Sequence, residues 1–288
     1  MMVKFFDPIT KEEITYYIAP NLLPQWDNLK NGKLQKQDED RVYITDGRER
    51  AGKSLFTLQQ AKYLDPTFDI SRVCFTPEEF LFQIRNAPAG SAIVFDEAFR
   101  GLSSKTSQSK VNKTIVQAMM EMGQKNLIVF IVLPTFFLLE MYAAVLRANV
   151  LFHIYKDRSG RRRFRIYNYK KKSWLYKVGK KKGFDYSFPR ISRRHTGRFY
   201  GVFPIDEKSY RKKKLDSLKG FEQLFEEDTG TEKFHKAVGG MIKAEKKINP
   251  KISDKKLVVV FKEKYFIDVS LTNVGVIRRK TRETTKNP

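Results

Sequence analysis

An eight-residue stretch near the start of the chain constrains the fold more than any other feature. It fits the pattern G-x-x-x-x-G-K-[ST] and reads Gly47-Arg48-Glu49-Arg50-Ala51-Gly52-Lys53-Ser54. A β-rich run, residues 41–46, precedes it, and a run with apolar residues at helical spacing, 55–64, follows it. A strand, a glycine loop and a helix N-terminus together form a cradle of backbone N–H groups for phosphate. These flanks favour a nucleotide-binding loop over a chance match.

The motif predicts the ligands of ATP and its metal ion. We expect ATP to be bound by Gly47, Arg48, Glu49, Arg50, Ala51, Gly52, Lys53, Ser54 and Leu55. Lys53 is expected to reach the β- and γ-phosphates, and the Ser54 hydroxyl to hold Mg²⁺. The three charged residues inside the loop are unusual: their arginines either contact phosphate or point into solvent.

A second motif supports the first. Residues 91–98, Ser-Ala-Ile-Val-Phe-Asp-Glu-Ala, form an apolar run that ends in two carboxylates. Such a run suits a strand buried on both faces of a parallel sheet, with its acids beside the phosphate loop. We expect Asp96 to hold Mg²⁺ and Glu97 to polarise the water that attacks the γ-phosphate. The alternative is that both acids only cap the segment that follows.

The elements that follow alternate between strand and helix. Strands are predicted at 71–75, 92–95, 127–133 and 149–155, and helices at 77–85, 111–124 and 136–146, with a polar loop at 101–110. This order predicts an α/β fold, a P-loop NTPase core with a mainly parallel sheet. The strand between the two motifs, and the glutamate after Asp96, indicate the added-strand, catalytic-glutamate type.

The predicted domains follow the changes in composition. They are an N-terminal extension (1–40), the ATPase core (41–155), a basic β-rich appendage (156–215), a linker (216–230), a small C-terminal helical module (231–280) and a disordered tail (281–288). In the module, residues 253–262 and 269–280 resemble a helix-turn-helix that directs Thr272, Asn273 and Arg278 toward a groove. A plain packing module explains the same pattern.

Positive charge is concentrated after the core. Residues 156–214 hold 22 lysines and arginines against four acids, a net charge of +18 in a chain whose net charge is +24. Ten aromatic residues lie among these charges, and residues 162–169 and 173–178 read as an antiparallel hairpin with Lys170, Lys171 and Lys172 in its turn. Basic surface with interleaved aromatics is typical of nucleic-acid binding, here expected to be DNA rather than RNA. A generally basic solvated surface, or an anionic membrane surface, is the alternative.

Other features set limits on the class of protein. The single Cys74 allows no intramolecular disulfide, is expected to be a packed core thiol, and fits a reducing, cytoplasmic location. No secretory signal is expected at the N-terminus. The apolar stretch 127–146 is long enough to span a bilayer, but Pro134 and Glu140 favour a buried strand and helix instead.

With both motifs placed, residues 40–155 resemble the FtsK/HerA-type motor ATPases, particularly the phage and plasmid branch of zonular-occludens-toxin-like proteins. The resemblance rests on residues 47–54 and 93–97, and on the helix and strand of residues 119–135. It implies that Lys53 and Ser54 bind phosphate and Mg²⁺, that Asp96 binds Mg²⁺ and that Glu97 activates water. It also implies a γ-phosphate sensor at Thr135. Members of this group are hexameric or membrane-docked motors that move DNA.

A ring-shaped motor needs a cation from a neighbouring subunit to stabilise the transition state. Arg147 is the first candidate, ahead of Arg158 and Arg100, although an arginine in its place is also an ordinary helix C-terminal cation. The sequence therefore predicts an oligomeric, ATP-driven motor, with a hexamer as one option, that translocates or packages DNA for a phage, plasmid or other mobile element. A regulatory ATPase switch that assembles on DNA, and a structural DNA-binding protein with a residual nucleotide site, are the alternatives.

Overall fold

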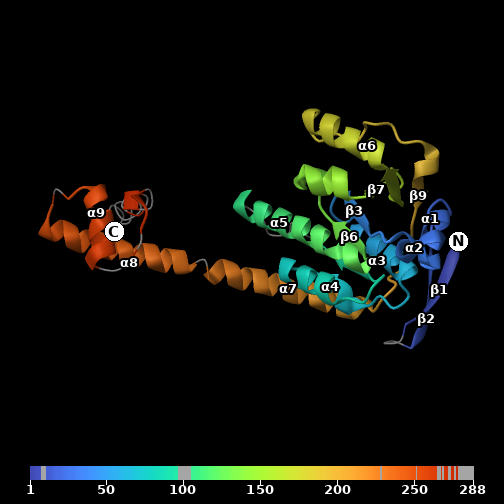
Figure 1. The fold of residues 1–288 in the computed structure, drawn as a ribbon, viewed down its shortest axis with the longest axis horizontal. Helices are drawn as coiled ribbons and strands as arrows, with labels where there is room; N and C mark the ends of the chain where they lie inside the picture. The colour runs from blue at the N-terminus through green and yellow to red at the C-terminus, as the bar shows by residue number, and fades with distance from the viewer. Residues whose placement is uncertain are drawn as a thin grey trace. The chain divides into compact units, whose positions relative to one another are not determined.

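The computed structural model describes residues 1–7, 11–96, 105–227, 229–250, 252–264, 267, 269–271, 274–275 and 277. The chain divides into two compact units, residues 1–217 and residues 218–288, which are described separately. Some residues named above lie outside the described part: Glu97, Arg100, Thr272, Asn273, Arg278 and 281–288. Figure 1 shows the arrangement of helices and strands.

A seven-stranded sheet is the centre of the first unit (Figure 1). Its strands are β3 (Arg41–Gly47), β4 (Val73–Cys74), β5 (Ala92–Phe95), β6 (Ile128–Val132), β7 (Val150–Lys156), β8 (Arg162–Tyr167) and β9 (Thr196–Arg198), in the order β4-β5-β6-β3-β7-β8-β9. The first five strands of this order are parallel, and β8 and β9 extend them in antiparallel fashion. Because β6 lies between β3 and β5, the two motif strands are not neighbours. This order confirms the predicted α/β fold of the added-strand type.

Helices cover both faces of the parallel strands (Figure 1). Alternate side chains of each strand enter different cores: Phe130 of β6 belongs to one and Ile131 to the other. The first core includes α3 (Lys53–Leu64), and the second includes α4 (Pro77–Asn86) and residues of α5 (Lys105–Glu121). Burial on both faces explains the continuous apolar runs that identified these strands.

The N-terminal segment forms a second wall around α3. It comprises β1 (Met2–Asp7), β2 (Glu12–Tyr17), α1 (Leu23–Asn28), a π-helical turn (Leu29–Lys33) and α2 (Leu34–Gln37). The Tyr16 hydroxyl donates a hydrogen bond to the carbonyl of Gln59 at 3.0 Å, and the Trp26 indole donates to the side chain of Gln60 at 2.8 Å. Every residue of α3 from Leu55 to Leu64 is buried as a result. This wall holds the helix that begins at the phosphate loop.

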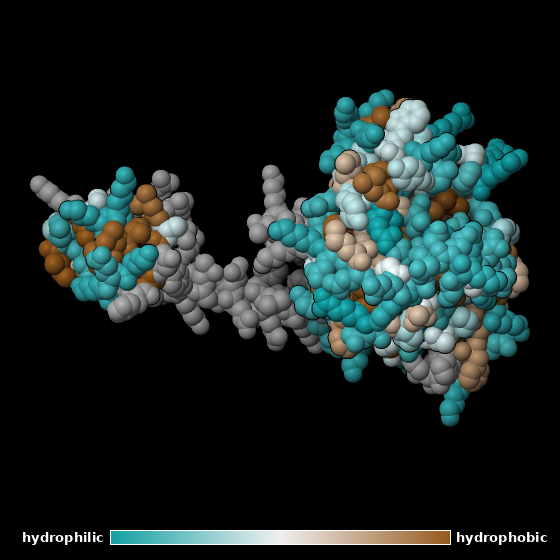
Figure 2. Space-filling model, viewed as in Figure 1, coloured by the Kyte–Doolittle hydropathy of each residue, from teal (hydrophilic) through white to brown (hydrophobic). Residues whose placement is uncertain are grey.

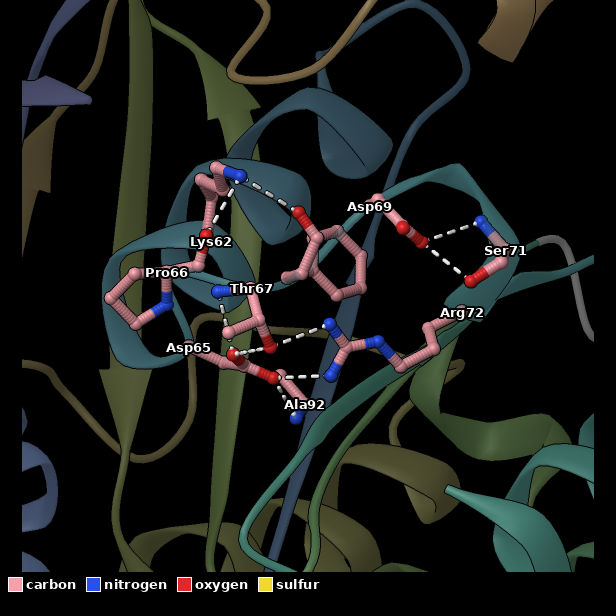
Figure 3. Close-up of polar contacts among 9 residues, drawn as sticks. Lys62, Asp65, Pro66, Thr67, Asp69, Ser71, Arg72 and Ala92 are labelled. Carbon is pink, nitrogen blue, oxygen red and sulfur yellow. Dashed lines mark hydrogen bonds and ion pairs between the residues drawn. The ribbon is translucent and has the colours of Figure 1, made fainter. Parts of the chain in front are cut away.

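A buried polar network fixes the chain where α3 ends (Figure 3). Asp65 accepts a hydrogen bond from Arg72 at 2.5 Å and another, on the same oxygen, from the backbone N–H of Ala92 at 2.9 Å. Thr67 donates to the other oxygen of Asp65. Lys62 donates to two backbone carbonyls of the same turn. The network ties the end of α3 to the first residue of β5, so both motif-bearing elements share one anchor.

The basic segment departs from the predicted hairpin. The antiparallel partner of β8 is β7, and residues 169–174 form α6 (Tyr169–Trp174), followed by a π-helical turn (Leu175–Gly179). The side chain of Asn168 accepts a hydrogen bond from the backbone of Lys171 at 3.1 Å and so caps the helix. The hairpin prediction is therefore wrong, and β8 and β9 join the basic segment to the core sheet.

Lys172 is buried rather than exposed in a turn. Its ammonium donates to the carbonyls of Ala144 at 2.5 Å and Val145 at 2.7 Å, near the end of the π-helical turn Tyr142–Arg147. The expectation that all three lysines of 170–172 face a phosphate backbone is thus wrong for Lys172. Burial lowers the pKa of Lys172 to about 7.

This depressed pKa predicts a pH dependence of folding. Between pH 7 and 10.5 the unfolded chain keeps a proton on Lys172 that the folded chain releases, so stability rises with pH across that window and levels off below it. One such proton contributes at most about 1.4 kcal/mol per pH unit. In urea unfolding at several pH values, Lys172→Met should remove this slope and the exposed Lys170→Met should retain it. Equal slopes in wild type and Lys172→Met would contradict the prediction.

The long apolar stretch at 127–146 is broken up in the fold. It contains β6, a 3₁₀ turn (Phe136–Leu138) and the start of the π-helical turn Tyr142–Arg147, in place of the predicted continuous helix 136–146. The Asn112 side chain bonds the carbonyl of Leu138 and the N–H of Glu140, which holds the interruption open. Among the described residues, no helix is both long and apolar enough to cross a membrane.

Cys74 lies in β4 and is fully buried, as predicted. Burial raises the pKa of its thiol to about 12, which makes it unreactive. Within the described ranges, no group of three or more His, Cys, Asp or Glu side chains is placed to hold a metal ion.

The second unit is a small helical module. It contains α8 (Thr229–Ile248) and α9 (Asp254–Lys264), and α7 (Glu207–Glu227) begins in the first unit and ends in the second. Its core consists of Val238, Ile242, Leu257, Phe261, Val269, Val274 and Ile277. Of the predicted linker 216–230, every described residue is helical. Figure 2 shows hydrophobic side chains on the visible face of this unit, where Ile248 and Val259 are exposed.

Candidate nucleotide-binding site

The phosphate loop connects β3 to α3 in a backbone conformation that glycine allows. Gly47 has φ +137°, and Gly52, directly before α3, has φ +100°. A Cβ on Gly47 would lie 2.0 Å from the carbonyl oxygen of Ile154, so the loop passes too close to β7 for any side chain there. Ala51 and Leu55 are buried, whereas Arg48, Glu49 and Arg50 are exposed. The loop charges therefore point into solvent, the second of the two readings.

Lys53 curls back over the loop. Its ammonium donates hydrogen bonds to the carbonyls of Gly47 at 2.8 Å and Arg48 at 3.2 Å. This position holds a positive charge directly above the N-terminus of α3, where the helix dipole already favours an anion. The structure therefore places a cation where a bound polyphosphate would need one.

Ser54 and Asp96 meet although 42 positions separate them. The Ser54 hydroxyl donates to Oδ1 of Asp96 at 3.0 Å, and Asp96 is fully buried directly after β5. A hydroxyl and a carboxylate oxygen at this distance are the hard oxygen ligands that Mg²⁺ prefers. The two predicted metal ligands thus fit the ion, and the loop beside them fits the phosphates of ATP.

Tyr210, which the sequence did not reveal, completes the surroundings of Asp96. It lies near the start of α7, is 4% exposed, and donates from its hydroxyl to Oδ2 of Asp96 at 2.5 Å. Each oxygen of the Asp96 carboxylate therefore accepts a hydroxyl proton, from Ser54 on one side and Tyr210 on the other.

A second polar cluster lies on the opposite side of the loop. Asp46, fully buried just before Gly47, accepts a hydrogen bond from the backbone of Phe136 at 2.8 Å and another from the hydroxyl of Tyr186. Its other oxygen contacts Nδ1 of His153 at 2.9 Å. Burial, and then the nearby Asp46 carboxylate, raise the pKa of Tyr186, which therefore stays neutral and donates its proton.

Thr135, the predicted sensor, belongs to this cluster. Its hydroxyl lies 2.9 Å from that of Tyr186, and both residues line a cavity of 660 Å³ along the outer side of the loop. The walls of this cavity are Gly47, Arg48, Glu49, Ala51, Pro134, Thr135, His153, Ile154, Tyr155, Lys156, Phe184, Asp185 and Tyr186. The sensor role of Thr135 stays a prediction, but its side chain is fixed close to the loop.

Arg147 does not lie beside the phosphate loop. Its guanidinium forms a bidentate ion pair with Asp40 and also donates to the carbonyl of Met119 at 3.0 Å. Asp40 directly precedes β3, at the end of the strand opposite to Gly47. This buried pair gives Arg147 a structural role in place of the expected role as an arginine finger. Glu97 lies outside the described residues, so its role stays a prediction.

A concave basic surface adjoins the loop from the other side; we call it the cationic groove. It is a cavity of 380 Å³ lined by Lys156, Gly160, Arg161, Arg162, Arg163, Arg198, Phe199, Tyr200 and Gly201. Arg162 forms part of both walls: its Cδ lies 3.2 Å from where a Cβ on Gly52 would stand. The Arg198 guanidinium lies 5.8 Å from the rings of Tyr17 and Tyr200.

No family model and no curated protein matches the sequence. Among solved structures, the N-terminal domain of zonular occludens toxin from Neisseria meningitidis is similar to 60% of this chain, over 98% of its own length, with 14% identity and a TM-score of 0.31. A second solved structure, of another ATPase domain, is similar to 52% of this chain, over 89% of its own length, with 10% identity and a TM-score of 0.30. The chain's own strand order, phosphate loop and Ser54–Asp96 pair give its first unit the fold of a P-loop ATPase.

Proposed function

We propose that this protein is an oligomeric, ATP-hydrolysing motor that acts on nucleic acid, with DNA as its substrate. The observation that carries the proposal is the common wall between the phosphate loop and the cationic groove, formed where Arg162 packs on Gly52. Contact between the two surfaces allows a nucleic-acid strand to influence the nucleotide site, and the reverse.

The chemistry follows from the residues at the loop. Lys53 binds the β- and γ-phosphates, and Ser54 and Asp96 hold Mg²⁺. Bound there, Mg²⁺ would supply positive charge that offsets the charge developing on the transferred phosphoryl oxygens. Glu97, directly after Asp96, orients the attacking water and accepts its proton.

The groove has the composition of a surface that binds a nucleic-acid backbone. Its cations replace phosphate counterions, and an exposed ring beside them offers a face for a base. Of the ten aromatic residues in the basic segment, Tyr169, Trp174, Phe184, Phe188 and Tyr200 are exposed, whereas Phe164, Tyr167 and Phe199 belong to the core. Tyr200 is the exposed aromatic that lines the groove. These features support single-strand contact at Tyr200 and Arg198.

Assembly of several copies would supply a cation in trans. Among the candidate fingers, Arg158 lies in the exposed turn between β7 and β8, close to the groove. Arg147 is no longer proposed for this role because Asp40 holds it. Use of the motor to translocate or package DNA for a mobile element is part of the proposal and follows from the resemblance of residues 40–155.

Removing charge from the groove should weaken nucleic-acid binding. Lys156→Gln, Arg161→Gln and Arg198→Gln together remove three cations, so the log–log dependence of single-stranded DNA affinity on salt should become less steep by about 2. Fluorescence anisotropy with a labelled oligonucleotide over a range of salt concentrations measures this slope.

The matched control replaces three exposed lysines outside the groove, Lys11, Lys33 and Lys36, by glutamine. Its net charge equals that of the groove variant, so general electrostatics affects both alike. A salt slope that is the same in wild type and in the groove variant would show that the groove does not contact phosphates.

A further inference from the structure

The start of α7 is fastened to the edge of the parallel sheet. Asp206 caps the helix by accepting a hydrogen bond from the backbone of Ser209 at 2.9 Å, and Lys213 donates to the carbonyl of Val73 in β4 at 2.7 Å. The ring of Tyr210 lies between those of Phe75 and Phe203, with centroids 5.8 and 5.6 Å away. These contacts aim the Tyr210 hydroxyl past β4 to the end of β5.

The bond from Tyr210 to Asp96 crosses a long stretch of sequence, 114 positions, and ends on a metal ligand. A hydrogen bond to a buried carboxylate is short and strong because the acceptor carries a full charge. It fixes the orientation of the carboxylate, with Oδ2 toward Tyr210 and Oδ1 toward Ser54. Groups that hold a metal ligand in this way commonly contribute to metal affinity.

α7 is also the helix along which the chain leaves the first unit. It starts at Glu207, passes the boundary between the units at Ser217 and continues to Glu227. A change in the strength of the Tyr210–Asp96 bond therefore acts on the first turns of the helix that leads toward the second unit.

We propose that Tyr210 is a positioning residue that orients Asp96 for Mg²⁺ and transmits the state of the nucleotide site to α7. The inference rests on the proposed nucleotide site. A cation at Asp96 draws charge from the carboxylate and so weakens the bond that Asp96 accepts from Tyr210. The first turns of α7 then lose one of their anchors and open more often.

The test uses the full chain with Mg²⁺ and the non-hydrolysable analogue adenylyl imidodiphosphate. In wild type, amide hydrogen exchange of residues 206–217 should become faster when Mg²⁺ and the analogue are added. In Tyr210→Phe the same amides should exchange faster from the start and should not respond further. The Mg²⁺ concentration that half-saturates analogue binding should rise roughly 10-fold or more.

Two matched variants separate this role from a loss of packing. Tyr142→Phe removes a hydroxyl from a tyrosine that is 38% exposed and should behave as wild type. Lys213→Met removes a different anchor of α7, so it should speed exchange in α7 while the Mg²⁺ requirement stays unchanged.

The outcomes distinguish the inference from the proposed function. Wild type that binds the analogue with Mg²⁺, together with a Tyr210→Phe variant equal to it in exchange and in Mg²⁺ requirement, would overturn the role of Tyr210 alone. A wild type that binds no analogue at any Mg²⁺ concentration would overturn the nucleotide site and the inference with it.

Discussion

Replacing Lys53 by alanine is expected to abolish measurable ATP hydrolysis, with a fall in rate of the order of 10²–10³-fold or more. The variant loses the cation that faces the β- and γ-phosphates, and the remaining loop N–H groups cannot offset a charge of that size. Phosphate release at saturating Mg·ATP measures the rate, and titration with a fluorescent ATP analogue measures binding.

The control for Lys53→Ala is Lys33→Ala, which removes an exposed lysine from the N-terminal segment. Because Lys53 also donates to the carbonyls of Gly47 and Arg48, thermal unfolding should be compared to show that the loop variant is folded. Hydrolysis at the wild-type rate by folded Lys53→Ala would mean that the loop is not the nucleotide site.

Replacing Glu97 by glutamine is expected to separate binding from hydrolysis. The variant should bind Mg·ATP as wild type does and hydrolyse it about 10²–10⁴-fold more slowly, since glutamine cannot accept the proton of the attacking water. Single-turnover hydrolysis, with binding followed separately, measures both quantities. Glu78→Gln, at a glutamate in the first turn of α4, is the matched control. Unchanged hydrolysis by Glu97→Gln would transfer the role of base to another group.

The sequence predicted the features that depend on fixed local spacing. The phosphate loop lies between a strand and a helix, as its motif requires, and the apolar run at 92–95 is β5 with the predicted limits. The contact of Ser54 with Asp96 also follows from the motifs, because parallel strands bring their carboxyl ends to one edge of the sheet. The mainly parallel sheet itself follows from the alternation of strands and helices along the chain.

The polar partners of the site could not be predicted from the sequence. Tyr186 reaches Asp46 across 140 positions, and nothing local distinguishes it from the other aromatic residues of the basic segment. Tyr210 lies in a run of charged residues that reads as a solvated helix. Such contacts depend on how distant elements pack, which no periodicity encodes.

The basic segment shows a different limit. A run of three lysines was interpreted as a turn, although the structure buries Lys172 against two carbonyls and leaves Lys170 exposed. A local signal existed in Asn168, a helix N-cap residue directly before the run. Arg147 was assigned by position after a helix, and its partner Asp40 is 107 positions away. Charge alone therefore did not separate surface cations from structural ones.

Steady-state hydrolysis of Mg·ATP with and without single-stranded DNA at low salt tests the central claim most directly. The account predicts hydrolysis that requires Mg²⁺, rises when DNA is added, and loses that rise in the variant Lys156→Gln/Arg161→Gln/Arg198→Gln while hydrolysis without DNA persists. A folded wild-type protein that hydrolyses no ATP with Mg²⁺ and DNA present, or whose rate is the same with and without DNA, would contradict it.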